Sequence, residues 1–289
     1  MPNNFDPSSI AFAVITYYPK WYGGNLQSIK HTDKVRGDLA IDFFKEASKR
    51  GYQVVAADGK SSKTFRKTIS KIPLLTIINR RSVKRSLAKK QAIKKASGLL
   101  GAKVIVLTEA EKISLVTDCL PELVNPIIND EADIIIPKRS ATLFQKTYPE
   151  YMFQSEREGN KLYNDILRIN GFLKDREEFD AFFGPRIFKN TSEIRALFTR
   201  GYRIKIDKKA FLEPYFDPET YSTTFSLPLI KAFKKGLRVK SVEVPFSYPM
   251  IQRDNEEKGA RELFEEKRRI QRVGFLVELL YIIHYLNQR

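Results

Sequence analysis

Two carboxylates, Glu109 and Glu111, stand two residues apart directly after the apolar run of residues 104–107. This run is short and β-branched, as expected for a buried strand. Ligands of open α/β sheets bind beyond the carboxyl ends of the strands. If the chain stays extended there, both side chains point the same way and could hold one Mg²⁺ or Mn²⁺ that bridges to nucleotide phosphates. The alternative interpretation is a pair of solvated loop acids followed by Lys112.

A run of cations precedes these acids. Residues 60–95 contain 13 Lys and Arg and no Asp or Glu. Like charges four residues apart on a helix repel each other, and a bound anion offsets that repulsion. Phosphates would be held there by charge-assisted hydrogen bonds, whereas the alternative is a solvated basic face. The cations expected nearest the acids are Arg80, Arg81, Arg85 and Lys89.

Alternating strand-like and helix-like segments must position these side chains. Strands are expected at residues 10–17, 52–57, 74–78, 103–108 and 132–136, and helices at 35–50, 82–97 and 120–128. This alternation predicts an α/β fold with a mostly parallel sheet and helices on both faces. The second half is less regular. Helices are expected there at 150–170, 191–199, 218–235 and 260–287, and strands at 181–188, 203–206 and 239–245.

The amino-acid composition limits the kinds of binding partner and the cellular compartment that fit this chain. The chain has 289 residues and a formal net charge of +17, which implies an anionic partner such as a nucleotide, a nucleic acid or a membrane surface. A single cysteine, Cys119, excludes an intrachain disulfide and fits a reducing compartment. Residues 1–9 are polar and unlike a signal peptide, and the apolar stretch 275–286 is too short to span a bilayer. We therefore expect a cytoplasmic protein whose last helix packs in a core, in a dimer or peripherally on an anionic membrane.

Several segments, in this order, resemble one family. Residues 14–19, Val-Ile-Thr-Tyr-Tyr-Pro, resemble the first-strand signature of the family 2-like glycosyltransferases of the GT-A fold. Residues 54–62 resemble the Asp-Asp-Gly-Ser segment of that family, and residues 109–111, Glu-Ala-Glu, stand where it carries Asp-x-Asp. Residues 121–127 and 131–139 are similar to the helix and strand that follow. The resemblance covers about residues 10–190.

The resemblance implies a glycosyltransferase that moves a sugar from a nucleotide-diphosphate-sugar donor to an acceptor hydroxyl, usually with Mn²⁺ or Mg²⁺. It places Tyr17 beside the nucleobase, Asp58 against the base or ribose, and Glu109 and Glu111 against ribose and metal. Asp180 falls where inverting members carry the base that takes the acceptor proton. The family also implies a GT-A-like nucleotide-sugar-binding catalytic domain over residues 1–250. A C-terminal lid loop and helix would follow over residues 251–289.

The chain departs from the family pattern at three positions. Ala57 replaces the first aspartate of Asp-Asp-Gly-Ser, Lys60 replaces its serine, and Lys20 replaces the glutamate of the first turn. These changes leave open a metal-independent enzyme, in which Arg and Lys supply the cation's charge, and an inactive relative. A nucleotidyltransferase is a further alternative, although Gly23 and Gly24 match its phosphate loop poorly. The carboxylates at 109 and 111 argue against a third alternative, a basic nucleic-acid-binding protein, because they repel phosphate.

Overall fold

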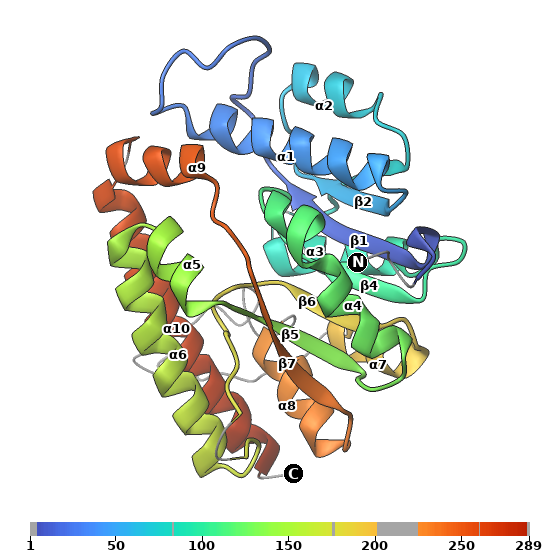
Figure 1. Cartoon of the computed structure of the whole chain (residues 1–289), viewed down its shortest axis with the longest axis vertical. Helices are drawn as coiled ribbons and strands as arrows, with labels where there is room; N and C mark the ends of the chain where they lie inside the picture. Colours follow the sequence, from blue (N-terminus) through green and yellow to red (C-terminus); the bar gives the residue numbers. More distant parts are fainter. Residues whose placement is uncertain (1–4, 83, 175–176, 201–224, 260, 288–289) are drawn as a thin grey trace.

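A seven-stranded sheet forms the centre of the computed structural model (Figure 1). The structure describes residues 5–82, 84–174, 177–200, 225–259 and 261–287. The strand order is β3-β2-β1-β4-β6-β5-β7. Strand β6 is antiparallel to both of its neighbours, and the other strand pairs of the described sheet are parallel. The strands are β1 (Ile10–Thr16), β2 (Gln53–Asp58), β3 (Leu75–Asn79), β4 (Val104–Leu107), β5 (Ile134–Arg139), β6 (Arg186–Lys189) and β7 (Val239–Val244).

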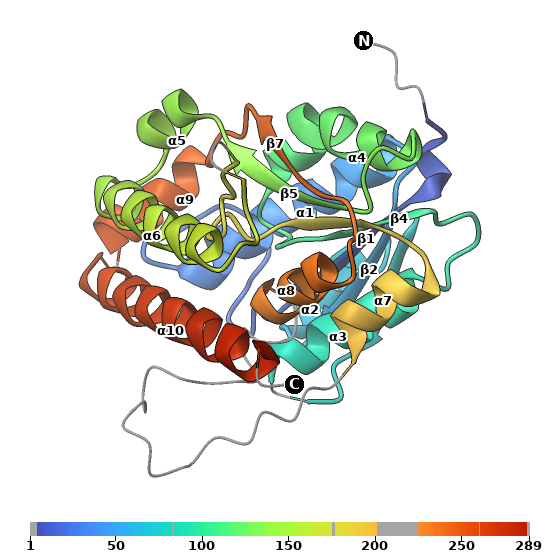
Figure 2. The ribbon, with the colours of Figure 1, turned by 90° about the horizontal axis from the view of Figure 1, so that it is seen from below.

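Helices cover both faces of this sheet (Figure 2). One face carries α1 (Thr32–Lys49), α2 (Lys63–Ile69) and α4 (Leu120–Ile128). The other face carries α3 (Arg85–Ala96), α7 (Ser192–Thr199) and α8 (Leu227–Lys234). The α/β class expected from the sequence, with a mostly parallel sheet between two helical layers, is confirmed.

The pleat of β1 shows why both faces are apolar. Alternate side chains of a strand point to opposite faces, so Phe12 and Phe43 of α1 share one core. Ala13 and Ile93 of α3 belong to the other core. A strand that is covered on both faces has a continuous run of apolar residues in its sequence. This pattern predicts β1 and β4.

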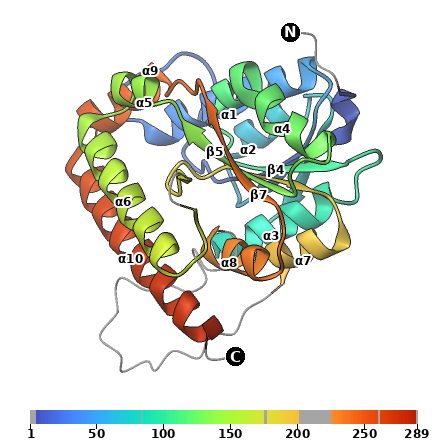
Figure 3. The ribbon, with the colours of Figure 1, turned by 60° about the horizontal axis from the view of Figure 1, so that its bottom comes forward.

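The remaining helices stand to one side of the sheet. They are α5 (Ala141–Thr147), α6 (Glu150–Ile169), α9 (Met250–Asp254) and α10 (Arg261–Asn287). Helices α6 and α10 lie side by side (Figures 1 and 3), and Leu279 and Ile282 of α10 are buried with Tyr163 and Leu167 of α6. The apolar stretch at the end of the sequence is therefore used in a core. Among the described residues, no helix has the length and apolarity needed to cross a membrane.

Several expected elements differ in the structure. The strand expected at 181–188 is reduced to β6, because Gly184, with a φ of +100°, and Pro185 turn the chain before it. The expected lid loop is helical, formed by α9 and a π-helical turn, Asn255–Gly259, in which Glu256 is fully buried. The strand expected at 203–206 and the start of the helix expected at 218–235 lie outside the described residues. The domain boundary at residue 250 stays a prediction.

The parallel strands bring their carboxyl ends to one edge of the sheet. Strand β1 ends at Thr16, β2 at Asp58, β3 at Asn79 and β4 at Leu107. Strand β6 runs the opposite way and begins at this edge, with Arg186 paired to Leu107. The residues that follow β1, β2, β3 and β4 therefore meet those that precede β6. They meet at the edge of the sheet where α/β proteins bind ligands.

Candidate functional site

Asp58 organises the turn after β2. Its carboxylate oxygens accept hydrogen bonds from the hydroxyls of Thr16 at 2.9 Å and Ser61 at 2.5 Å. They also accept from the backbone N–H groups of Lys60 and Ser61, both at 3.1 Å. These contacts hold Lys60 at a φ of +71°, a conformation that L-residues rarely adopt. Asp58 is at the predicted edge but only 1% exposed, so its most direct effect is on the shape of the turn.

Tyr17 and Arg80 enclose Gly59 on the outer side of this turn. A Cβ atom on Gly59 would stand 2.7 Å from Nη1 of Arg80 and 3.2 Å from Cδ2 of Tyr17. The Tyr17 side chain is 57% exposed. Burial, and then the charge of Arg85, lower the pKa of Arg80 from its ordinary value. The carboxyl ends of β1, β2 and β3 thus present an exposed aromatic ring beside a guanidinium group.

The chain turns immediately after β4. The backbone N–H of Lys112 donates to the carbonyl of Glu109 at 3.3 Å, and the strand ends at Leu107. The interpretation that Glu109 and Glu111 point the same way along an extended chain is therefore wrong. Because of this turn, the two carboxylates have different neighbours.

Glu111 contacts the segment that follows β1. Its Oε1 atom accepts a hydrogen bond from the hydroxyl of Tyr18 at 2.8 Å. Burial and the nearby charge of Glu111 raise the pKa of Tyr18, which therefore remains a donor. Burial would lower the pKa of Arg36, but Glu111 and Glu256 raise it above its ordinary value. One oxygen of Glu111 is thus already engaged by a hydroxyl group of the protein.

Glu109 lies among cations. The Nζ atom of Lys112 is 3.8 Å from its Oε2 atom. Burial would raise the pKa of Glu109, but Lys112 and Lys89 together lower it. The Oε2 atom is shielded from solvent and has no hydrogen-bond partner in the described parts of the chain. A Cβ atom on Gly184 would stand 3.0 Å from Oε2, so the glycine makes room for this carboxylate.

Lys89 and Arg186 complete the group around Glu109. The Lys89 ammonium lies 4.2 Å from the centre of the Phe225 ring, and the Arg186 guanidinium lies 5.0 Å from the same centre. Arg186 is 2% exposed and donates to the backbone carbonyls of Pro185 and Ala181. Burial lowers the pKa of Lys89 to about 8, and Glu109 is the main group opposing that shift. We call Lys89, Glu109, Lys112 and Arg186 the cation cluster.

The cation cluster fits a divalent metal poorly. A Mg²⁺ or Mn²⁺ site needs several oxygen ligands converging on one point. Glu111 is engaged by Tyr18, and the Lys112 ammonium lies beside the buried oxygen of Glu109. Within the described residues, no group of three or more His, Cys, Asp or Glu could hold a metal ion.

Two further residues that were predicted to bind the nucleotide-sugar donor lie near the carboxyl edge of the sheet. Arg81 follows β3, its backbone N–H donates to Oε1 of Gln91 at 3.1 Å, and its side chain is exposed. Arg85 begins α3 and is exposed, and its charge lowers the pKa values of Arg80 and Lys89. Arg85 therefore lies between the Tyr17 side of the edge and the cation cluster.

Asp180 is held in a buried ion pair. Its Oδ2 atom accepts from Nε of Arg139 at 2.6 Å and its Oδ1 atom from Nη2 at 2.7 Å. Asn160 donates to the same Oδ1 atom at 2.8 Å, and Glu156 accepts from Nη1 of Arg139 at 2.8 Å. Burial would raise the pKa of Asp180, but Arg139 lowers it. This geometry favours a positioning role over the base predicted from the sequence, because both oxygens are bonded.

Sequence reasoning missed Lys112, Arg139 and Arg186. Lys112 was taken only as a sign that the neighbouring acids are solvated, and a lysine in a loop carries no signal of burial. Arg139 stands at the end of β5 and Arg186 at the start of β6, and both are almost fully buried. Buried arginines are rare unless they are paired. An arginine at the end of an apolar strand, such as Arg139, was therefore the available sign of a buried ion pair.

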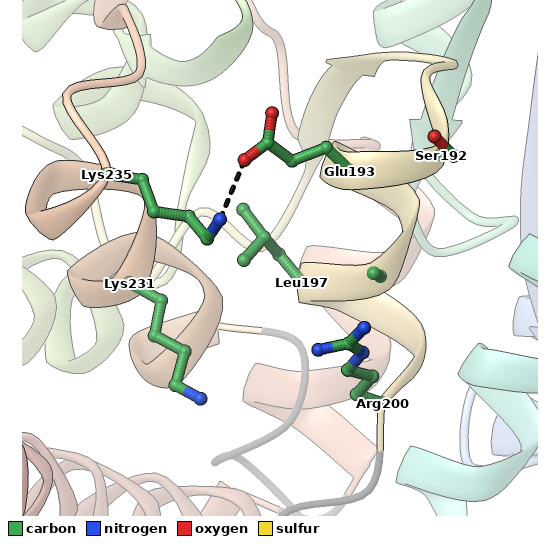
Figure 4. Close-up of a pocket in the computed structure, with 7 residues that line it drawn as sticks. Ser192, Glu193, Leu197, Arg200, Lys231 and Lys235 are labelled. Carbon is green, nitrogen blue, oxygen red and sulfur yellow. Dashed lines mark hydrogen bonds and ion pairs between the residues drawn. The ribbon is translucent and has the colours of Figure 1, made fainter.

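A surface hollow lies elsewhere, between α7 and α8 (Figure 4). It encloses about 390 Å³ and is crossed by an ion pair of 2.7 Å between Lys235 and Glu193. Apolar Leu197 and charged Arg200 and Lys231 complete much of its lining. None of the residues lining this hollow belongs to the cation cluster.

The seven-stranded sheet and the helices on both of its faces define a mixed α/β fold. No protein-family model and no curated protein matches the sequence. Among solved structures, the chain is similar to a protein from Desulfovibrio desulfuricans assigned as a nucleotide-diphospho-sugar transferase. Identity is 13% and the TM-score is 0.46, over 96% of this chain and 98% of that one.

Two other solved structures are similar at the same level. One is a 4-diphosphocytidyl-2C-methyl-D-erythritol synthase from Anaerococcus prevotii, with 12% identity and a TM-score of 0.45, over 89% of this chain and 100% of that one. The other is a mannosyltransferase from Pyrobaculum calidifontis in complex with GDP-Man and Mn²⁺, with 13% identity and a TM-score of 0.38, over 100% of this chain and 78% of that one. Likeness at this level assigns this chain to no family.

Proposed function

We propose that this protein is a glycosyltransferase that takes its sugar from a nucleotide-diphosphate-sugar donor. The observation that supports this most directly is the arrangement of two different groups on one sheet edge. An exposed aromatic ring, Tyr17, lies over Gly59 beside Arg80, and the cation cluster lies at the ends of β4 and β6. A flat ring suits a nucleobase, and a set of cations suits a diphosphate.

The chemistry needs charge stabilisation at the leaving group. The acceptor oxygen attacks the anomeric carbon, the bond from that carbon to the diphosphate oxygen breaks, and the diphosphate leaves with the electron pair. Fixed positive groups near the departing oxygen stabilise the negative charge that develops there. Lys89, Lys112 and Arg186 would supply such groups. The acceptor proton passes to a base, and Glu109 is a second candidate beside Asp180 because its Oε2 atom accepts no hydrogen bond from the described residues.

A ligand panel tests the proposal. Thermal shift with UDP, GDP, CDP and ADP is compared with short single-stranded DNA and RNA of equal phosphate concentration. A nucleoside diphosphate at about 100 times its Kd stabilises the folded state by about 2.7 kcal/mol. The proposal requires one diphosphate to stabilise the protein specifically and requires Tyr17→Ala to weaken that binding. Stabilisation by nucleic acid alone would overturn it in favour of a nucleic-acid-binding protein.

Reaction products separate the two enzymatic alternatives. A glycosyltransferase supplied with the donor sugar releases a nucleoside diphosphate. A nucleotidyltransferase supplied with a nucleoside triphosphate and a sugar phosphate releases pyrophosphate. Both products can be measured by ³¹P NMR in one reaction series. Release of pyrophosphate without any diphosphate would replace our proposal with the nucleotidyltransferase.

A further inference from the structure

We propose that the fixed cations Lys89, Lys112 and Arg186 take the place of a divalent metal ion, so that this protein binds the diphosphate of its donor without metal. The inference rests on the proposed function, because it concerns how the same site holds its ligand. It reverses the metal site expected from Glu109 and Glu111. It is carried by the contacts of the cation cluster and by its charge.

The carboxylates of the predicted metal site are already partnered. Glu111 accepts from the Tyr18 hydroxyl at 2.8 Å. The Lys112 ammonium is 3.8 Å from the buried Oε2 atom of Glu109. A cation entering between Glu109 and Lys112 would have to displace an ammonium group that the chain holds in place.

Aromatic rings fix the positions of these cations. Lys112 lies 4.9 Å from the centre of the Phe183 ring and 5.4 Å from that of Phe246. Lys89 lies 4.2 Å from the centre of the Phe225 ring, on which Arg186 also rests. A cation over an aromatic face is stabilised without being neutralised, so its charge remains free to act on a ligand.

The cation cluster contains an N–H group that is free to donate a hydrogen bond to a ligand. The Nε–H group of Arg186 is buried and has no acceptor in the described residues. The Lys89 ammonium lies over the Phe225 ring, 4.2 Å from its centre, and the residue is only partly buried. Buried donors without partners are destabilising, and a phosphate oxygen is an acceptor that would satisfy them.

The charge of the cluster selects an anion. Within the cation cluster, three cations face one carboxylate, Glu109, so the cluster itself carries more positive than negative charge. A divalent cation would be repelled by this excess, whereas a diphosphate would neutralise it. Arg85 and Arg80 extend the positive region towards Tyr17, in the direction of the nucleoside.

Calorimetry with and without metal tests the inference. The full chain is titrated with UDP and with GDP, first with EDTA and then with Mn²⁺ or Mg²⁺ in excess. We expect the Kd of the preferred diphosphate to change less than about threefold between these conditions. An affinity that rises more than about tenfold with metal would overturn the inference and leave the proposed function standing. Absence of binding in both conditions would instead overturn the proposed function.

Matched variants locate the cations that act. With EDTA present, Lys89→Met and Lys112→Met are each expected to raise the Kd for the diphosphate by about tenfold or more. The nucleoside without phosphates should bind each variant as it binds the wild type. Lys94→Met is the control, because Lys94 is on the same helix as Lys89 but exposed. If Lys89→Met does not fold, Lys89→Arg replaces it and should keep the affinity. Equal losses for diphosphate and nucleoside, or a loss with Lys94→Met, would overturn the assignment.

Discussion

At the scale of single residues, Asp180 and Glu109 are both carboxylates of the candidate site but differ in their bonding. Asp180 forms a buried ion pair with Arg139, and removing one partner of such a pair is strongly destabilising. We therefore predict that Asp180→Asn lowers the free energy of unfolding by about 3 kcal/mol, as measured by urea denaturation. Glu109→Gln should lower stability less than Asp180→Asn, because the Glu109 side chain is 40% exposed, and should lower the transfer rate. A fully stable but inactive Asp180→Asn variant would support the base role instead.

If Lys89 holds the diphosphate as we propose, binding should depend on pH. Burial lowers its pKa to about 8, and the groups that face it are Glu109, Arg85, Arg186 and Lys112. Because only the protonated ammonium attracts phosphate, affinity should be highest below this pKa and fall as pH rises through it. We predict a weaker affinity at about pH 9 than at about pH 7.

Proton uptake provides an independent measurement of the same group. Calorimetry near pH 8 in buffers of different ionisation enthalpy should show that the protein takes up protons when the diphosphate binds. Lys89→Arg is the matched control, since a guanidinium stays charged in this range and should remove both effects. An unchanged pH profile in that variant would show that another group titrates.

At the scale of elements, the segment before β6 positions the cation cluster. Gly184 has a φ of +100°, and a Cβ atom there would meet both Glu109 oxygens, at 3.0 and 3.1 Å. We predict that Gly184→Ala lowers the free energy of unfolding by about 1–3 kcal/mol and also weakens diphosphate binding. Gly236→Ala is the control, since it has a φ of +69° but nothing within 4 Å of its Cβ position. It should lower stability without changing affinity, and a similar loss of affinity in both variants would contradict this reasoning.

Most elements could be predicted because their signals are local. The apolar runs of β1 and β4 and the helix α10 follow directly from residue pattern, and the sheet edge follows from their order. The direction of β6 could not be predicted, because a run of four residues does not specify whether its neighbours are parallel or antiparallel. The turn at Glu109 could not be predicted for a similar reason, since it is closed by the backbone of Lys112, beyond the strand.

The candidate site was predicted only in part. Tyr17, Asp58 and Glu109 lie at the carboxyl edge, because each stands at or just after the end of a parallel strand, and Lys89 of α3 acts on Glu109 through its charge. What the sequence could not provide was the partner of each charge. Asp180 is separated from Arg139 by 41 residues, and that pairing depends on how α6 and β5 pack.

At the scale of the whole molecule, the net charge of +17 and the cation cluster should respond differently to salt. Binding of nucleic acid to dispersed surface cations falls by roughly 10³-fold or more between 50 and 200 mM salt when several phosphates are contacted. Binding to partly buried cations is screened much less. We predict that diphosphate affinity falls less than about tenfold over that range while any nucleic-acid binding is lost. Parallel titrations by fluorescence anisotropy and calorimetry test this, and equal salt dependence would place the diphosphate on the open surface.

The antiparallel strand β6 has a consequence for how the protein matures. It lies between β4 and β5, so its hydrogen bonds complete the middle of the sheet and not its border. Until the ribosome has synthesised β6, which begins at residue 186, β4 and β5 each have an unpaired edge. Unpaired strand edges are prone to aggregate. Arg186 and the preceding Gly184 reach Glu109 only when this strand inserts. We therefore expect closure of the sheet and assembly of the cation cluster to occur as one event during synthesis.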